Sequence, residues 1–146
     1  MKPNRPLTAS ARDTIAALVQ PSRVESMHPM AARFVYGLRL IALHDRAKRD
    51  PVPELAVRLG SVEVAAKALS LAHAISASWP ENIHVSRFCC KLMSHDETTI
   101  AAMVETAMRR DRRAFDAAIE GLVRPDRHER LWDRSLALVA AEMQAL

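Results

Sequence analysis

The chain has 146 residues, of which 49% are hydrophobic, 26% charged and 4% aromatic, and only 3 are glycines. This length supports one domain with a substantial core. So few glycines argue against a turn-rich sheet fold, and the sequence lacks the glycine-rich loops that cradle phosphates. The abundance of Ala, Leu, Arg and Met is typical of helical proteins. We therefore expect an all-α fold, a compact bundle of five to seven helices.

Charge is unevenly distributed along the chain. The formal net charge of +4 comes from 21 basic and 17 acidic side chains, and residues 1–50 hold nine of the basic but only four of the acidic ones. The positive excess therefore lies in the first third of the sequence. Such a concentration favours a polyanionic partner such as nucleic acid.

Residues 1–27 are expected to form a basic arm with a short helix, and residues 28–146 a helical domain. The arm begins with a proline-containing basic stretch, and Thr8 or Ser10 can cap a helix that runs to about Gln20. This region has no continuous apolar core, unlike a secretory signal.

The cellular compartment is indicated by two further features. No apolar run is long enough to cross a membrane. The two cysteines, Cys89 and Cys90, are adjacent, and neighbouring cysteines rarely bridge each other. We therefore expect a reducing, cytoplasmic location, in contact with the nucleoid if the partner is DNA.

Helix signals are strong between residues 28 and 78. Proline follows His28 at a first-turn position, and apolar residues then recur at helical spacing up to a break at residues 50–53. Gly60 suits a left-handed helix end, and Ser61 can cap the helix that follows. We predict one helix before the break, a short one over residues 53–60 and a longer one over 61–78.

The second half of the chain continues the helical pattern. Residues 83–92 are expected to form a short helix, although Ile83 and Val85 also allow a strand. Ser94 and Glu97 match a capping box, in which each side chain bonds a backbone amide of the other residue. We predict that this box opens a helix to about Arg109, followed by a helix from Asp111 to about Leu122 and a final amphipathic helix after residues 124–126.

Two places could hold a helix-turn-helix, the motif that presents one helix to the major groove of DNA. In residues 54–69, Ala56, Gly60 and Leu69 stand at offsets that suit two closely packed helices and a tight turn. The second helix would present Ser61, Val62, Glu63 and Ala66 to DNA, with Lys67 as its only cation. Because that face is apolar and acidic, an ordinary helical hairpin in the core is favoured there over a DNA reader.

The second place, residues 84–109, resembles a known DNA-binding domain. There the run His95-Asp96-Glu97-Thr98-Thr99-Ile100 follows a segment whose apolar positions are Phe88 and Leu92. This stretch resembles the C-terminal domain of the bacterial replication initiator, in which a basic residue followed by Asp-His-Thr-Thr-Val opens the recognition helix. Here Met93-Ser94 replaces the family's Gly-Gly turn, His95 its arginine and Glu97 its histidine. The resemblance therefore implies a DNA reader without the initiator's target sequence.

Short polar side chains at the start of a helix can reach base edges once that helix enters the major groove. The methyl groups of Thr98 and Thr99 can pack against thymine, and Asp96 can accept a hydrogen bond from cytosine. Free amides beside Ser94 can bind a phosphate. We expect base contacts from Asp96, Glu97, Thr98 and Thr99, phosphate contacts from Arg87, Lys91, Arg109, Arg110, Arg112 and Arg113, and further interface positions at Ser94 and His95.

The same residues also have a purely structural explanation. A capping box accounts fully for Ser94 and Glu97. The arginines between residues 109 and 113 can form a solvated face that pairs with Asp111 and Asp116. The sequence leaves this alternative open.

A second resemblance concerns the whole layout. The chain combines an opening His28-Pro29-x-Ala31-x-Arg33-Phe34 helix, a mid-chain helical pair and a Cys89-Cys90 segment that leads into a capped helix. This layout resembles the N-terminal part of the gene transfer agent activators of alphaproteobacteria, which turn on genes for a phage-like DNA-transfer particle. The resemblance implies a transcriptional activator that binds promoter DNA, with a separate sigma-like protein, RNA polymerase and a DNA-bending protein as further partners.

Catalytic and metal-binding patterns are weak. His84, Cys89, Cys90 and His95 could suggest zinc, but adjacent cysteines do not easily approach one tetrahedral ion together. No nucleophile elbow or His-Glu-x-x-His pattern is present. We therefore expect no metal, no cofactor and no enzymatic activity.

Two other interpretations remain open. The final helix carries an apolar stripe, Leu131, Trp132, Leu136 and Val139, that could bind RNA polymerase or another regulator, although a place for Trp132 in the core is favoured. A redox sensor built on Cys89 and Cys90 would need exposed thiols with a lowered pKa.

Overall fold

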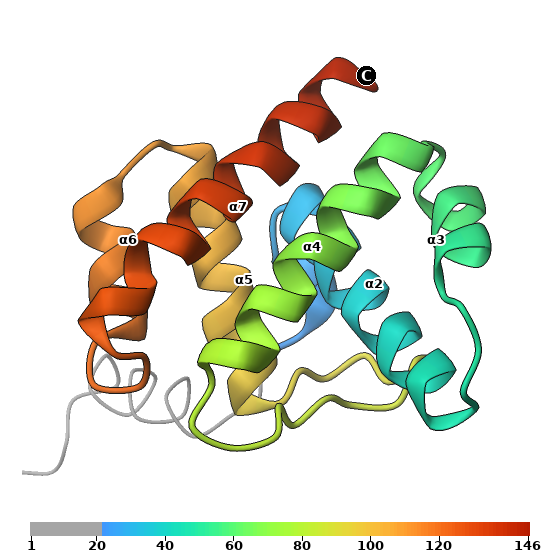
Figure 1. Cartoon of the computed structure of the whole chain (residues 1–146), viewed down its shortest axis with the longest axis horizontal. Coiled ribbons are helices and arrows are strands. Elements are labelled where there is room, and N and C mark those ends of the chain that lie inside the picture. The colour runs from blue at the N-terminus through green and yellow to red at the C-terminus, as the bar shows by residue number, and fades with distance from the viewer. Residues whose placement is uncertain (1–21) are drawn as a thin grey trace, which may run out of the picture.

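The computed structural model describes residues 22–146 (Figure 1). Within this range the chain forms six α-helices after one short 3-10 helix, and the only strand-like pairing is an isolated bridge between Arg23 and Leu92. The predicted all-α bundle is confirmed. The elements are η1 (Val24–Ser26), α2 (Pro29–Arg46), α3 (Val52–Leu59), α4 (Val62–Ser78), α5 (His95–Met108), α6 (Arg112–Ile119) and α7 (Pro125–Gln144).

The helices pack around a shared interior. α4 packs against α7 on one side and α3 on the other, while α5 contacts α2, α6 and α7. Figure 1 shows α3 and α6 at opposite edges of the molecule, with α4 and α7 side by side between them. This arrangement leaves the outer faces of α3 and of the first half of α4 uncovered by the other helices of residues 22–146.

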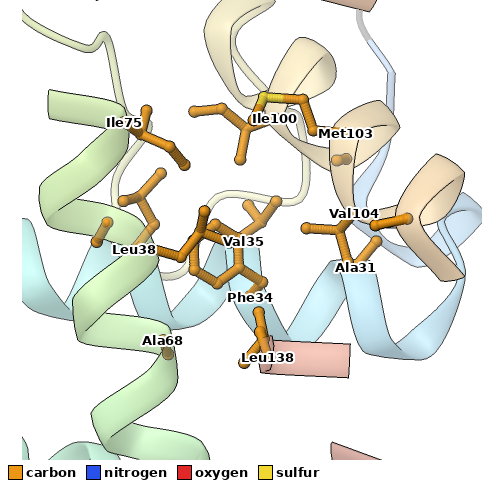
Figure 2. Close-up of a cluster of buried hydrophobic side chains, with 14 of the residues drawn as sticks. Ala31, Phe34, Val35, Leu38, Ala68, Ile75, Ile100, Met103, Val104 and Leu138 are labelled. Carbon is orange, nitrogen blue, oxygen red and sulfur yellow. The ribbon is translucent and has the colours of Figure 1, made fainter. Parts of the chain in front are cut away.

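All six α-helices contribute apolar side chains to the core, and Figure 2 shows the part where α2, α4, α5 and α7 meet. Phe34, Val35 and Leu38 of α2 lie at its centre, each no more than 5% exposed. They meet side chains of three other helices, namely Ala68 and Ile75 of α4, Ile100, Met103 and Val104 of α5, and Leu138 of α7. The apolar spacing seen in the sequence of α2 is therefore the face that organises the bundle.

Local sequence signals fix most helix starts. The hydroxyl of Ser61 accepts a hydrogen bond from the amide of Val64, and a carboxylate oxygen of Asp111 accepts one from Ala114. The imidazole of His28 accepts from the amide of Met30, next to Pro29 in the first turn of α2. Each bond satisfies an amide that the helix itself leaves without a partner.

The end of α3 depends on glycine. Gly60 has a φ of +74°, in the left-handed region that other residues adopt at a cost, and no atom lies within 4 Å of the position that a β-carbon would take there. We expect Gly60→Ala to lower the free energy of unfolding by about 1–2 kcal/mol through backbone strain alone. Urea unfolding followed by circular dichroism measures this loss, and an unchanged midpoint would show that the turn relaxes without strain.

The predicted short helix over residues 83–92 is absent. Residues 79–94 form a non-helical connection with one turn, in which the amide of Cys90 donates to the carbonyl of Arg87. The backbone of this connection pairs with residues near the start of the described chain instead. The amide of Val24 donates to Lys91, and the amide of Met93 donates to Ser22. These long-range bonds replace the bonds that a helix would make.

The predicted arm also needs correction. Residues 22–27 pack on the folded body, where Val24 is 1% exposed and η1 contacts α2. The body therefore begins before residue 28. The short helix predicted up to Gln20 lies outside the described residues.

Candidate nucleic-acid interface

α3 and α4, the first of the two places that the sequence suggested, are two consecutive helices joined by a tight turn. The eight-residue α3 and the 17-residue α4 are joined only by Gly60 and Ser61. Leu55 and Leu59 on the inner face of α3 are buried against the bundle. A short helix, a glycine turn and a longer helix in close contact are the parts of a helix-turn-helix motif.

Arg33 of α2 holds the turn in place. Its guanidinium donates to the carbonyl of Leu59 at 2.6 Å and forms a bidentate pair with Glu142 of α7, at 2.8 and 2.9 Å. These bonds connect α2, the end of α3 and α7. The orientation of α3 and α4 is therefore fixed by groups outside the motif.

The first half of α4 is open to solvent. Val62 is 70% exposed, and Val57 at the outer face of α3 is 81% exposed. Glu63, Ala66 and Lys67 are also exposed. The surface thus offers small apolar groups, one carboxylate and one cation beside amides at a helix start. Methyl groups can contact thymine, a carboxylate can accept from cytosine, and a helix start attracts phosphate.

The start of α5 differs from this open arrangement because residues of the preceding connection cover part of it. Ser94 and Glu97 form the predicted capping box, which is confirmed. The Ser94 hydroxyl also donates to the carbonyl of His84, and the amide of His84 donates to Asp96 at 2.7 Å. The chain itself therefore uses Ser94 and the Asp96 carboxylate that were predicted to contact DNA.

The two threonines in the first turns of α5, Thr98 and Thr99, are half-buried. The hydroxyl of Thr98 donates to the carbonyl of Ser94 at 3.0 Å, and that of Thr99 donates to His95 at 3.2 Å. Both hydroxyl hydrogens are thus used in hydrogen bonds within the helix. The methyl groups and the oxygen lone pairs remain for contacts with a partner. His95 is exposed beside them.

Glu97 cannot serve as the predicted base contact. Its side chain is fully buried, and its carboxylate pairs with Arg39 of α2 at 2.6 and 3.0 Å. Burial alone would raise the pKa of Glu97, but the hydrogen bonds from Arg39 and from the Ser94 amide lower it overall. A charged carboxylate bound in this way faces the core instead of solvent.

Arg39 of α2 is a basic residue that lies in the interior of the bundle. It is 2% exposed and donates to the carbonyls of Cys90 and Leu92, at 2.6 and 3.0 Å, as well as to Glu97. One buried guanidinium therefore connects α2, the non-helical connection and the start of α5.

The predicted phosphate contacts do not form one surface. α5 has 14 residues and spans about 21 Å, so Arg109 and Arg110 lie at the end opposite to Thr98. Arg112 is already paired with Asp116 at 3.0 Å and Glu129 at 2.7 Å. The other predicted phosphate contacts, Arg87 and Lys91 in the connection and Arg109, Arg110 and Arg113 near α6, are exposed.

The start of α5 also lies far from the start of α4. In Figure 1 α4 runs from the upper right to the lower left, and α5 begins below its C-terminal end. The two predicted motifs therefore present their helix starts at opposite ends of the molecule.

The apolar stripe of the last helix belongs to the core. Leu131 is fully buried and Val139 is 7% exposed, while the ring of Trp132 packs edge-to-face on Phe115 at 5.1 Å between centroids. Trp132 and Leu136 pack against the core but are only half-buried. The stripe therefore contributes to the bundle mainly through Leu131 and Val139.

Within residues 22–146, no helix is both long and apolar enough to span a membrane. In the same range, no three His, Cys, Asp or Glu side chains converge as a metal site would require. Cys89 is exposed and Cys90 half-buried, and neither forms a disulfide. No family model, curated protein or solved structure matches the chain.

Proposed function

We propose that the protein is a DNA-binding transcription regulator that inserts the first half of α4 into the major groove. The observation that supports this proposal is the pair of helices α3 and α4, joined by a two-residue glycine turn as a helix-turn-helix requires, with the start of α4 open to solvent. In this motif the second helix contacts base edges while the first crosses the sugar-phosphate backbone.

The side chains of α4 suit this placement. Val62 and Ala66 lie four residues apart and share one face, where their small size permits close approach to base edges. Lys67 stands beside them as a phosphate contact, and the basic balance of the whole chain adds a sequence-independent attraction. Glu63 restricts the bases that can be accepted at its position.

The start of α5 is a weaker candidate for reading bases. Residues 79–94, which lead into it, contain no helix in the position that the motif needs, and Glu97 is withdrawn into the core. In our proposal the exposed Arg87, Lys91 and His95 are not needed for base readout.

The role in activation rests on the sequence resemblance to gene transfer agent activators. On that basis we propose that the target is promoter DNA of phage-like particle genes, in the nucleoid. A separate sigma-like protein, RNA polymerase and a DNA-bending protein would complete the assembly. The proposal assigns no catalytic step and no cofactor to the chain.

A duplex titration tests the choice of α4. The duplex is selected by the full chain from a random pool, and affinity is measured by fluorescence anisotropy across a salt series. We expect Ala66→Glu to weaken specific binding by about tenfold or more, since it places a carboxylate against the groove. Lys67→Ala should weaken specific and random duplexes alike and reduce the salt slope by about one.

Thr98→Ala and Arg110→Ala provide the comparison, because they alter the two ends of α5. We expect both to retain the affinity of the unmodified chain. Loss of affinity in these variants with none in Ala66→Glu would assign base readout to α5. Affinity that does not fall with salt would exclude DNA as the partner.

A further inference from the structure

We propose that a groove between α2, α3 and the Arg87–Cys90 turn binds a helical segment of a partner protein, with an apolar side chain in the groove and carboxylates beside it. This site shares α3 with the surface proposed for DNA but does not include the first half of α4, and the inference does not depend on DNA binding. It is defined by a cavity, by an exposed apolar face that extends from the cavity, and by the charges at its rim.

The cavity has a volume of about 330 Å³ and a mainly apolar lining. Tyr36, Gly37 and Leu40 of α2 form one wall, and Leu55 of α3 forms another. The ring of Phe88 closes the third side, 6.0 Å from the ring of Tyr36. Such a hollow can accept a leucine or an aromatic side chain.

Gly37 lines the hollow without a side chain of its own. A methyl group there would meet only Leu55, with its Cδ2 atom at 3.4 Å, which is an ordinary contact. Glycine inside a helix costs about 1 kcal/mol relative to alanine, so the helix itself would be more stable with alanine. Glycine at this position keeps the cavity open without being needed for packing.

The apolar surface continues beyond the cavity along α2. Tyr36 is 39% exposed and Leu43 is 51% exposed, and they lie on one face of the helix, on either side of Leu40, which is only 3% exposed. Exposed apolar groups therefore occur at two positions about two helical turns apart, a longer span than a small molecule would need. A helix laid along α2, with side chains spaced by three and four residues, would cover it.

The charges at the rim select the chemistry of the partner. Arg33 and Arg58 line the cavity, with side chains 40% and 55% exposed. The carboxylate that pairs with Arg33 is only 8% exposed, and Arg58 reaches its partner Glu54 at a long 3.4 Å. The guanidinium of Arg58 also lies over the ring of Phe88, 5.2 Å from its centroid. Exposed positive charge therefore dominates the rim and favours carboxylates on the partner.

This charge also argues against residues 1–21 of the chain as the occupant. That segment contains three basic residues, Lys2, Arg5 and Arg12, against one acidic residue, Asp13. Its charge has the same sign as the rim. A separate acidic partner is thus the better match.

The test uses two synthetic helical peptides and the full chain labelled with ¹⁵N. Both peptides carry leucines at positions i, i+4 and i+7; one has glutamates beside them and the other has lysines. In two-dimensional NMR spectra, the acidic peptide should cause saturable shifts at Tyr36, Gly37, Leu40, Arg58 and Phe88. The lysine peptide should cause none at the same concentration.

Two variants and a control connect the shifts to the groove. Arg58→Glu should lower the affinity for the acidic peptide by about tenfold or more, because it replaces electrostatic attraction with repulsion. Gly37→Ala should also lower the affinity for the acidic peptide, while the melting temperature of the protein stays equal or rises. The two measurements together separate a change in the cavity from a loss of folding. Arg113→Glu makes the same charge change on α6, across the molecule, and should leave the affinity unchanged.

Several outcomes would overturn this inference. They are equal binding of both peptides, shifts outside the groove, no saturable shift, or self-association of the chain through the same residues in sedimentation experiments. Failure here would leave the DNA proposal intact, because no duplex is present in the measurement.

Discussion

Arg39→Met is expected to lower the free energy of unfolding by about 3–5 kcal/mol, the range found when one partner of a buried ion pair is removed. The substitution keeps an apolar side chain of similar length but leaves the carboxylate of Glu97 buried without its cation. It also removes the donors that bind the carbonyls of Cys90 and Leu92. Urea unfolding followed by circular dichroism gives the loss directly.

The double variant Arg39→Met/Glu97→Leu is the control for this prediction. It should be more stable than Arg39→Met alone, because no charge remains buried. Acid unfolding provides a second control. The lowered pKa of Glu97 contributes stability above the ordinary glutamate pKa, and this contribution is lost as pH falls through the folded-state value. Arg39→Met should remove that part of the pH dependence. A double variant less stable than the single one would contradict this account of the pair.

Phe115→Ala is expected to cost about 3–5 kcal/mol of stability while leaving DNA affinity unchanged. Phe115 is fully buried in α6, and its ring packs on Trp132 of α7 with an interplanar angle of 73°. Removal of the ring leaves a cavity between these helices. Because α6 lies at the opposite edge of the molecule from α3, the proposed DNA surface should keep its shape (Figure 1).

The two effects of Phe115→Ala are measured separately. Urea unfolding gives the stability, and anisotropy at a temperature where the variant remains folded gives the affinity for the selected duplex. A loss of affinity comparable to that of Ala66→Glu would show that the α6 and α7 packing contributes to the DNA surface.

Most helix boundaries could be predicted because short-range chemistry fixes them. Ser61, Ser94 and Asp111 cap their helices as their sequence positions indicated, and Gly60 adopts the left-handed conformation that ends α3. Each of these signals acts over three or four residues. A single sequence contains all the information that such local bonds require.

The connection over residues 79–94 could not be predicted in the same way. Its apolar residues have helical spacing, but its backbone bonds to residues 22–24 and to Arg39, far away in the sequence. Nothing within the segment indicates these partners. Long-range pairing of this kind overrides local propensity.

The candidate site was only partly predictable for a related reason. The capping box placed Glu97 correctly at the start of α5, but its second role, as the partner of Arg39, depends on how α2 lies against α5. Composition made α4 look unsuitable for DNA because it offers one cation. The fold leaves Val62 and Ala66 exposed at the start of α4, which a single sequence does not reveal. This exposure is why we now favour α4, and not a hairpin within the core, as the candidate for DNA contact.

The most direct test of the DNA proposal is a residue-by-residue map of the DNA contact. The ¹⁵N-labelled full chain is titrated with its selected duplex, and changes in amide NMR signals are followed. We predict that the largest changes occur from Ser61 to Ser70 at the start of α4, with small changes at residues 95–99. The largest changes at residues 95–99, with α4 unaffected, would contradict the proposal that α4 reads the DNA.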